Sequence, residues 1–287
     1  MAARPRTLPA AIAPVLVGTA AAVEVSDEIR VGAFIAALVG SVFIQIGTNL
    51  ANDYSDARRG ADAADRLGPV RVTSAGLVAP RRVLVATWIA FAIAVVAGIY
   101  LTTVAGPVIL AVGAASILAG VLYTGGPRPY GYEGLGELFV FLFFGLVAVN
   151  GSYYVQLERL DWLPFGLSLA VGFLATAILV VNNVRDVDTD RRAGKRTLAV
   201  RIGRRRARTL YASLVAAAFV AVPVTLIATG GPGWGLLALL ATPLVPGPLG
   251  AVMTRTDGPG LNAALAATGA LLGAFSSLLA AGLLLAA

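Results

Sequence analysis

Two groups of polar side chains in this chain follow helical spacing, three or four positions apart, and are suited to bind a divalent cation. Each consists of an amide followed by two aspartates, in Asn49, Asp53 and Asp56 and again in Asn182, Asp186 and Asp190. Side chains three and four positions apart lie on the same face of an α-helix. Both groups also fall at the C-terminal end of an apolar tract, where the helix dipole is negative and neighbouring carboxylates repel one another. The pattern therefore predicts a bound cation at each group.

The chain contains no cysteine and no histidine. This excludes disulfides, thiolate nucleophiles, the usual zinc sites and histidine acid–base chemistry. Ligand sets made only of oxygen select hard ions, and Mg²⁺ binds one or two carboxylates while water and phosphate complete its shell. We therefore expect Mg²⁺ to be the cofactor and a diphosphate to bridge the two groups. The predicted metal ligands are Asp53, Asp56, Asp186 and Asp190. The alternative to a metal site is a solvated, charged helix end. That alternative explains one such group better than two matching groups.

Basic side chains follow both groups. Most of them, including Arg204, Arg205 and Arg206, fit a role in topology or lipid-headgroup contact. Arg71 differs because it lies within the apolar segment 68–76, and Lys195 closely follows the second group. We predict that both bind phosphate or an acceptor carboxylate. The amides Asn49, Asn52 and Asn182 are predicted to orient the substrates.

A third polar segment, residues 123–137, is rich in glycine and proline, which is typical of a compact turn. It contains Tyr123, Arg128 and Tyr132, whose side chains could face an anion or an aromatic ring. We predict that Tyr123 and Arg128 take part in catalysis and that Tyr132 contacts substrate. The alternative is a structural turn whose tyrosines belong to a membrane interface.

Long charge-free tracts must position these residues. The 287 residues are 58% hydrophobic and only 13% charged. Tracts without Asp, Glu, Lys or Arg cover 7–23, 31–52, 83–127, 138–157, 162–184, 209–254 and 258–287. A helical span needs about 20 residues. The two longest tracts are long enough for two helices each and contain Gly- or Pro-rich breaks at 102–107 and 229–234. We therefore expect an all-α membrane protein of about nine helices that form one domain over residues 1–287.

The distribution of basic residues predicts the orientation of these helices. Of the 22 Lys and Arg residues, only Arg30 and Arg159 fall on one side of the nine-helix arrangement. Basic residues near the ends of spans stay in the cytoplasm. The N-terminus and both polar groups are therefore expected on the cytoplasmic side of the cell membrane, and the C-terminus outside. A net charge of +7 is explained by this asymmetry, so we expect no nucleic-acid partner.

The two polar groups resemble the signatures of the UbiA-type intramembrane prenyltransferases, Asn-Asp-x-x-Asp and Asp-x-x-x-Asp. Here they read 52–56 and 186–190, and the resemblance extends over nearly the whole chain. Within that family the chain is most similar to the branch that prenylates 1,4-dihydroxy-2-naphthoate in menaquinone synthesis. The segments that carry this similarity are 4–9, 52–62, 68–71, 123–127 and 134–137. Gly60 stands where many relatives have a third aspartate, and Asp62 is the candidate for that metal-binding role.

The resemblance implies a Mg²⁺-dependent transfer of a prenyl group from polyprenyl diphosphate to an aromatic acceptor. With 1,4-dihydroxy-2-naphthoate, loss of CO₂ restores aromaticity and gives demethylmenaquinone. Other acceptors, such as 4-hydroxybenzoate, a chlorophyllide or haem, are the main alternatives. A transporter is a further alternative, because carboxylates within membranes also mark ion pathways. Transporter sites usually lie near the membrane midplane, whereas both groups here lie at one interface, which favours the enzyme.

Overall fold

The computed structural model describes residues 4–60, 67–68 and 70–287, and this part of the chain is helical with no β-strand. The predicted metal ligand Asp62 lies outside the described residues. The α-helices are α1 (Pro9–Ser26), α2 (Val31–Arg58), α3 (Pro80–Ala105), α4 (Val108–Leu122), α5 (Gly136–Val140), α6 (Ala148–Leu157), α7 (Trp162–Arg192), α8 (Leu198–Thr229), α9 (Pro246–Thr254) and α10 (Gly258–Leu284). Shorter or tighter turns are η1 (Pro5–Thr7), η2 (Tyr130–Glu133), the π-helical η3 (Phe141–Val147) and η4 (Gly233–Leu244).

Both predicted helix breaks are present. The first apolar tract divides between α3 and α4 at Gly106, whose φ of 83° is a conformation that favours glycine. The second divides at Gly230, where α8 ends in a left-handed turn before η4 begins. These breaks allow each long tract to turn back on itself.

Seven helices of the described chain are long and apolar enough to cross a membrane. The pair η4 and α9, bent by 45°, would make an eighth span. The remaining apolar helix, α4, has 15 residues, fewer than the roughly 20 that a straight span needs. The prediction of a polytopic all-α membrane protein is therefore confirmed, whereas the count of nine spans stays a prediction.

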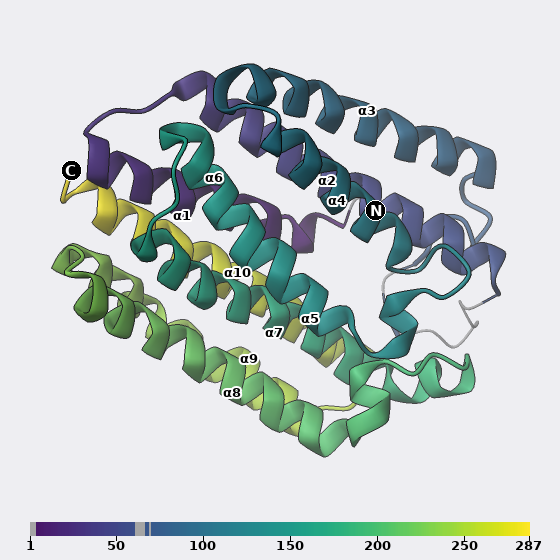
Figure 1. The fold of residues 1–287 in the computed structure, drawn as a ribbon. Helices are drawn as coiled ribbons and strands as arrows, with labels where there is room; N and C mark the ends of the chain where they lie inside the picture. The colour runs from purple at the N-terminus through teal and green to yellow at the C-terminus, as the bar shows by residue number, and fades with distance from the viewer. Residues whose placement is uncertain (1–3, 61–66, 69) are drawn as a thin grey trace.

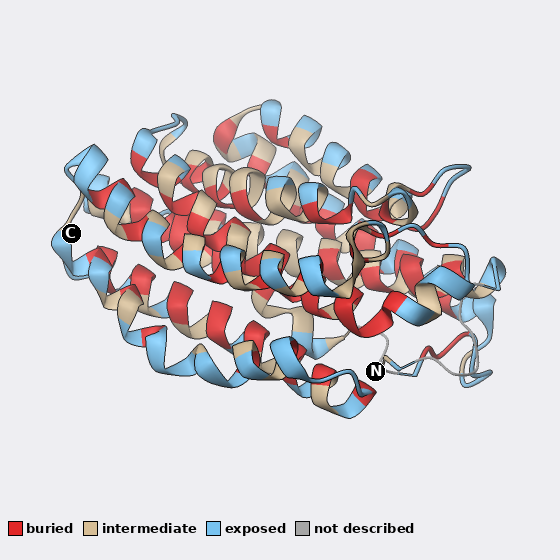
Figure 2. Cartoon of the chain, turned by 90° about the horizontal axis from the view of Figure 1, so that it is seen from below, coloured by how far each residue is buried: buried red, intermediate tan, exposed pale blue. Residues whose placement is uncertain are grey.

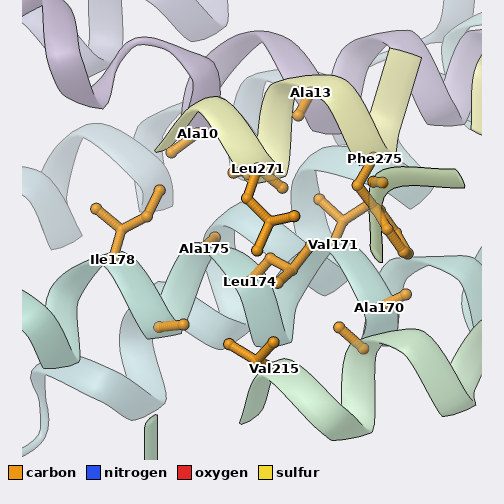
Figure 3. Close-up of a cluster of buried hydrophobic side chains, with 14 of the residues drawn as sticks. Ala10, Ala13, Ala170, Val171, Leu174, Ala175, Ile178, Val215, Leu271 and Phe275 are labelled. Carbon is orange, nitrogen blue, oxygen red and sulfur yellow. The ribbon is translucent and has the colours of Figure 1, made fainter. Parts of the chain in front are cut away.

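The long helices run roughly side by side, with α2, α3 and α4 along one edge of the bundle and α8 and α9 along the other (Figure 1). Helix α7 lies in the middle and packs against α1, α8 and α10. Figure 3 shows this core, in which Ala170 and Leu174 of α7 face Leu271 and Phe275 of α10. Where η3 crosses α7, a Cβ added to Gly145 would lie 2.7 Å from the Cα of Gly172. Small residues of this kind allow helices to pack closely in a membrane.

Exposed residues lie along the outside of the bundle (Figure 2), and many of them are large and apolar. Trp88, Val96 and Trp162 are more than half exposed, and Ile227 is 83% exposed. Exposed apolar surface on this scale marks contact with lipid or with another protein. The polar residues of interest lie instead at one end of the helices. Connections between α2 and α3, α4 and α5, and α7 and α8 meet there (Figure 1).

Candidate active site

A cavity of about 340 Å³ runs between the helices and receives side chains from α1 to α7. Its wall changes character along its length. At the end formed by the three connections it is polar, and further in it is lined by aliphatic and aromatic side chains such as Leu101, Ile109, Phe143, Val147 and Val155. The predicted site residues that line it are Asn49, Asn52, Asp56, Arg71, Tyr123, Tyr132, Asn182, Asp186, Asp190 and Lys195.

Asp56 is the centre of the first polar cluster. Helix α2 continues to Arg58, so this carboxylate stands on the last turn of the helix and is only 1% exposed. The Nη2 atom of Arg71 donates to its Oδ2 at 2.7 Å, and the Nζ atom of Lys195 lies 3.4 Å from the same oxygen. The hydroxyl of Tyr132 donates to its Oδ1. Each of the three connections therefore supplies one side chain to Asp56.

Tyr132 and Lys195 also contact each other. The Nζ atom of Lys195 lies 4.8 Å from the ring centroid of Tyr132, a cation–π distance. The backbone N–H of Arg196 donates to the carbonyl of Tyr132 at 2.9 Å, which joins the two connections directly. Burial, and then the adjacent Asp56 carboxylate, raise the pKa of the Tyr132 hydroxyl. Tyr132 therefore keeps its proton at neutral pH and acts as a donor.

Asp53 has a different environment from Asp56. Its carboxylate accepts hydrogen bonds from the backbone N–H groups of Val72 and Thr73, at 3.2 and 3.0 Å. It is not among the residues that line the cavity. In this structure Asp53 fixes the backbone next to Arg71 and thereby positions the guanidinium against Asp56. A direct role of Asp53 in metal binding stays a prediction.

Asp186 is the centre of the second polar cluster, on α7. The guanidinium of Arg185, itself only 1% exposed, binds both carboxylate oxygens of Asp186 at 2.8 and 2.6 Å. The same guanidinium donates to the side-chain oxygens of Asn182 and Asn262, each at 2.7 Å. This fork-to-fork arrangement fixes both the position and the plane of the carboxylate. Asp190 lies one turn further along α7 and also lines the cavity.

Several residues of the site were missed by sequence analysis. Arg185 and Asn262 are the clearest, since they come from α7 and α10 and meet only in the folded chain. Thr124 donates to the Oδ1 atom of Asn52 at 2.8 Å, and Asn183 donates to the buried Glu137 at 2.8 Å. A signal was present for Arg185, because an arginine at the end of an apolar tract and directly before an aspartate needs a partner.

Arg128 lies apart from both clusters. Its side chain is exposed in the turn before η2 and does not line the cavity. Pro129 and the following η2 turn direct Tyr130 and Tyr132 inward instead, and the Tyr130 hydroxyl donates to the carbonyl of Ala119 at 2.8 Å. The role predicted for Arg128 is therefore not supported by its position.

The oxygen donors at the polar end of the cavity fit Mg²⁺. Asp56, Asp186 and Asp190 line the same space, and each offers carboxylate oxygens to it. Within the described residues, no three acidic side chains converge into a cage that a metal could fill alone. An incomplete set of this kind suits Mg²⁺, which retains water and takes phosphate oxygens as ligands.

Comparison with known proteins identifies the family. Residues 11–260 match the UbiA prenyltransferase family. The chain is 46% identical to the 1,4-dihydroxy-2-naphthoate octaprenyltransferase of Mycobacterium tuberculosis over 93% of this chain and 90% of that protein. It is 40% identical to the protein of the same name from Escherichia coli over 84% of this chain and 80% of that protein.

Solved structures show the same fold at low sequence identity. A UbiA homolog from Aeropyrum pernix K1 has a TM-score of 0.67 at 16% identity and covers 96% of this chain and 97% of that one. A UbiA homolog from Archaeoglobus fulgidus, bound to DMAPP and Mg²⁺, has a TM-score of 0.64 at 13% identity with the same coverage. Together with the family match and the sequence relatives, these results show that the chain belongs to the UbiA prenyltransferase family, as its two aspartate motifs predicted.

Proposed function

We propose that this protein transfers a polyprenyl group from polyprenyl diphosphate to 1,4-dihydroxy-2-naphthoate, with loss of CO₂. The observation that carries the proposal is one cavity with carboxylates and cations at one end and an apolar wall beyond them. A diphosphate with a hydrocarbon tail has the same division of polarity. The acceptor is proposed from the relatives at 46% and 40% identity, whose names state it.

The chemistry breaks two bonds and forms one new carbon–carbon bond. The allylic C–O bond of the diphosphate breaks and its electron pair leaves with the diphosphate. The allylic carbon then bonds to the ring carbon that bears the carboxylate. Finally the bond to the carboxylate breaks, CO₂ leaves, and the electron pair returns to the ring. The product is the reduced form of demethylmenaquinone.

The cationic side chains are placed to receive the negative charge that develops on the leaving diphosphate. Arg71 and Lys195 share Asp56 in this structure and are 8% exposed, so their charges act in a poorly solvated site. Asp56, Asp186 and Asp190 are the proposed ligands of Mg²⁺, which when bound would neutralise diphosphate charge. Preorganised charge of this kind is usually the largest contribution to catalysis.

The apolar part of the cavity is proposed to hold the prenyl chain. Leu101, Ile109 and Val155 offer hydrocarbon contacts there, while Phe143 and Val147 come from the π-helical turn η3. These side chains also exclude water. Exclusion matters because a reactive allylic cation would otherwise be captured by water before it reached the acceptor.

Purified protein with farnesyl diphosphate, Mg²⁺ and a panel of acceptors tests the proposal. We expect 1,4-dihydroxy-2-naphthoate to be prenylated with release of one CO₂ per transfer, measured by mass spectrometry of the lipid extract and by trapped CO₂. We expect 4-hydroxybenzoate to give no product. If 4-hydroxybenzoate is prenylated and 1,4-dihydroxy-2-naphthoate is not, the proposed acceptor is wrong, although the chain still belongs to the family.

We also infer that the polar end of the cavity faces the cytoplasm, because Arg30 and Arg159 are the only two of 22 basic residues expected on the other side. Reporter fusions test this orientation. Fusions after Val70 and Lys195 should report the cytoplasm, and a fusion after Ala287 should report the outside. A cytoplasmic C-terminus would contradict the nine-span arrangement.

A further inference from the structure

Three cationic side chains line the cavity among the described residues: Arg4, Arg71 and Lys195. Arg71 and Lys195 share Asp56 at the end proposed for the diphosphate. Arg4 comes from a different part of the chain, the segment that leads into α1. The proposed acceptor carries its own negative charge, on its carboxylate, and a buried anion needs a charged or hydrogen-bonding partner. Arg4 therefore offers a cationic group in this cavity in addition to the pair at Asp56.

Arg4 lies beside a group of polar side chains that also line the cavity. The Thr7 hydroxyl donates to the carbonyl of Arg4 at 3.0 Å. The same hydroxyl oxygen accepts from the Nε2 atom of Gln45 at 3.2 Å and lies 3.5 Å from the Nδ2 atom of Asn49. Gln45 and Asn49 are 8% and 5% exposed, on successive turns of α2. A hydroxyl and two amides therefore meet beside the backbone of Arg4, and the side chain of Arg4 lines the same cavity.

The backbone that carries Arg4 is fixed by its surroundings. Arg4 has a φ of 48°, in the left-handed region that few non-glycine residues adopt. Helix α10 packs directly on this segment, because a Cβ added to Gly269 would lie 2.8 Å from the carbonyl oxygen of Arg6. The close contact at Gly269 holds the segment that carries Arg4 against α10. The left-handed conformation of Arg4 is strained, and such strain persists where the surrounding structure imposes it, often at ligand sites.

The spacing along α2 relates Arg4 to the diphosphate end. Asn49 precedes Asp56 by two turns of helix, which corresponds to roughly 10 Å. If the diphosphate lies near Asp56, its prenyl chain would extend inward, and the allylic carbon is bonded directly to a phosphate oxygen. In the proposed acceptor the attacked carbon itself bears the carboxylate. In this arrangement the carboxylate would lie just beyond the allylic carbon, near the level of Asn49.

We propose that Arg4, with Thr7, Gln45 and Asn49, binds the carboxylate of the aromatic acceptor and determines acceptor specificity. This inference rests on the proposed function, since it names the acceptor's place in the same cavity. It separates the two anions: Arg71 and Lys195 bind the diphosphate, and Arg4 binds the carboxylate. The N-terminal segment before α1 is then part of the active site.

The variant Arg4→Gln tests the assignment, with Arg6→Gln as the matched control. Arg6 is exposed in the same segment, does not line the cavity, and loses the same charge. In Arg4→Gln the KM for 1,4-dihydroxy-2-naphthoate should rise about 10- to 100-fold, the range expected when a charged hydrogen bond is lost. The KM for farnesyl diphosphate should stay within about two-fold of wild type. Arg6→Gln should match wild type in both constants.

A binding measurement without turnover separates this inference from the proposed function. Wild-type protein should bind 1-hydroxy-2-naphthoate more tightly than 1-naphthol, which lacks the carboxylate, and Arg4→Gln should lose that preference. Arg4→Lys keeps the positive charge but lacks the paired N–H donors of the guanidinium, so it should recover part of the preference for the carboxylate. If wild-type protein prenylates the naphthoate and Arg4→Gln keeps its acceptor KM, the inference is wrong while the proposed function stands. If Arg4→Gln raises the KM for the diphosphate instead, Arg4 belongs to the diphosphate site.

Discussion

Replacement of Asp56 or Asp186 by Asn should lower turnover by about 10- to 100-fold or more while the protein still inserts and purifies. Asn keeps the shape of the side chain but removes one negative charge from the proposed metal site, and loss of a ligand or its support typically costs 10- to 100-fold or more. Both side chains line the cavity, so the effect should fall on catalysis. Turnover of purified variants at several Mg²⁺ concentrations measures it, and excess Mg²⁺ should restore part of the activity.

Asp188→Asn is the matched control on the same helix. Asp188 is exposed, does not line the cavity, and pairs with Arg204 at 2.9 Å. Its replacement should leave turnover close to wild type. Asp53→Asn should behave differently again, because Asp53 binds the backbone of Val72 and Thr73. Its loss would displace Arg71, so excess Mg²⁺ should not restore activity. Near-normal rates in both Asp56→Asn and Asp186→Asn would contradict the proposed site.

Replacement of Arg185 by Leu should destabilise the fold by about 3–5 kcal/mol, the usual cost of leaving one partner of a buried ion pair without the other. The guanidinium is 1% exposed and makes hydrogen bonds to Asp186, Asn182 and Asn262, so its removal leaves a buried carboxylate and two amides without this partner. Thermal unfolding of the detergent-solubilised protein measures the change.

An exposed ion pair provides the comparison for Arg185. Arg201 pairs with Glu133 at 3.0 Å, and the two side chains are 40% and 53% exposed. Because solvent screens such pairs, Arg201→Gln should change stability by no more than about 1 kcal/mol. Equal losses of stability in Arg185→Leu and Arg201→Gln would mean that the Arg185 network does not hold α7 and α10 together.

The sequence was sufficient to predict the helical membrane fold, because charge-free tracts and Gly- or Pro-rich breaks act locally. The divisions at Gly106 and Gly230 fall inside the predicted breaks. The two aspartate motifs were visible for the same reason, since helical spacing alone places Asp53 and Asp56, or Asp186 and Asp190, near one another.

Long-range contacts could not be predicted in this way. Helical spacing places Asp53 close to Asp56 but does not specify that Asp53 binds the backbone at residues 72 and 73. The partner of Arg185 on α10, Asn262, is separated from it by 77 positions in the chain. Arg128 shows the same limit: its charge and its place in a Gly- and Pro-rich segment suggested a role in the site, but the sequence does not specify that the turn leaves its side chain exposed. Such contacts depend on how helices pack, which one sequence does not specify.

Metal removal from the wild-type protein tests the central claim most directly. Purified protein with farnesyl diphosphate and 1,4-dihydroxy-2-naphthoate should form the prenylated, decarboxylated product in Mg²⁺. EDTA should abolish that product and added Mg²⁺ should restore it, because the carboxylates of Asp56, Asp186 and Asp190 are proposed to bind the diphosphate through the metal. Turnover that persists unchanged in EDTA would contradict the metal–diphosphate site.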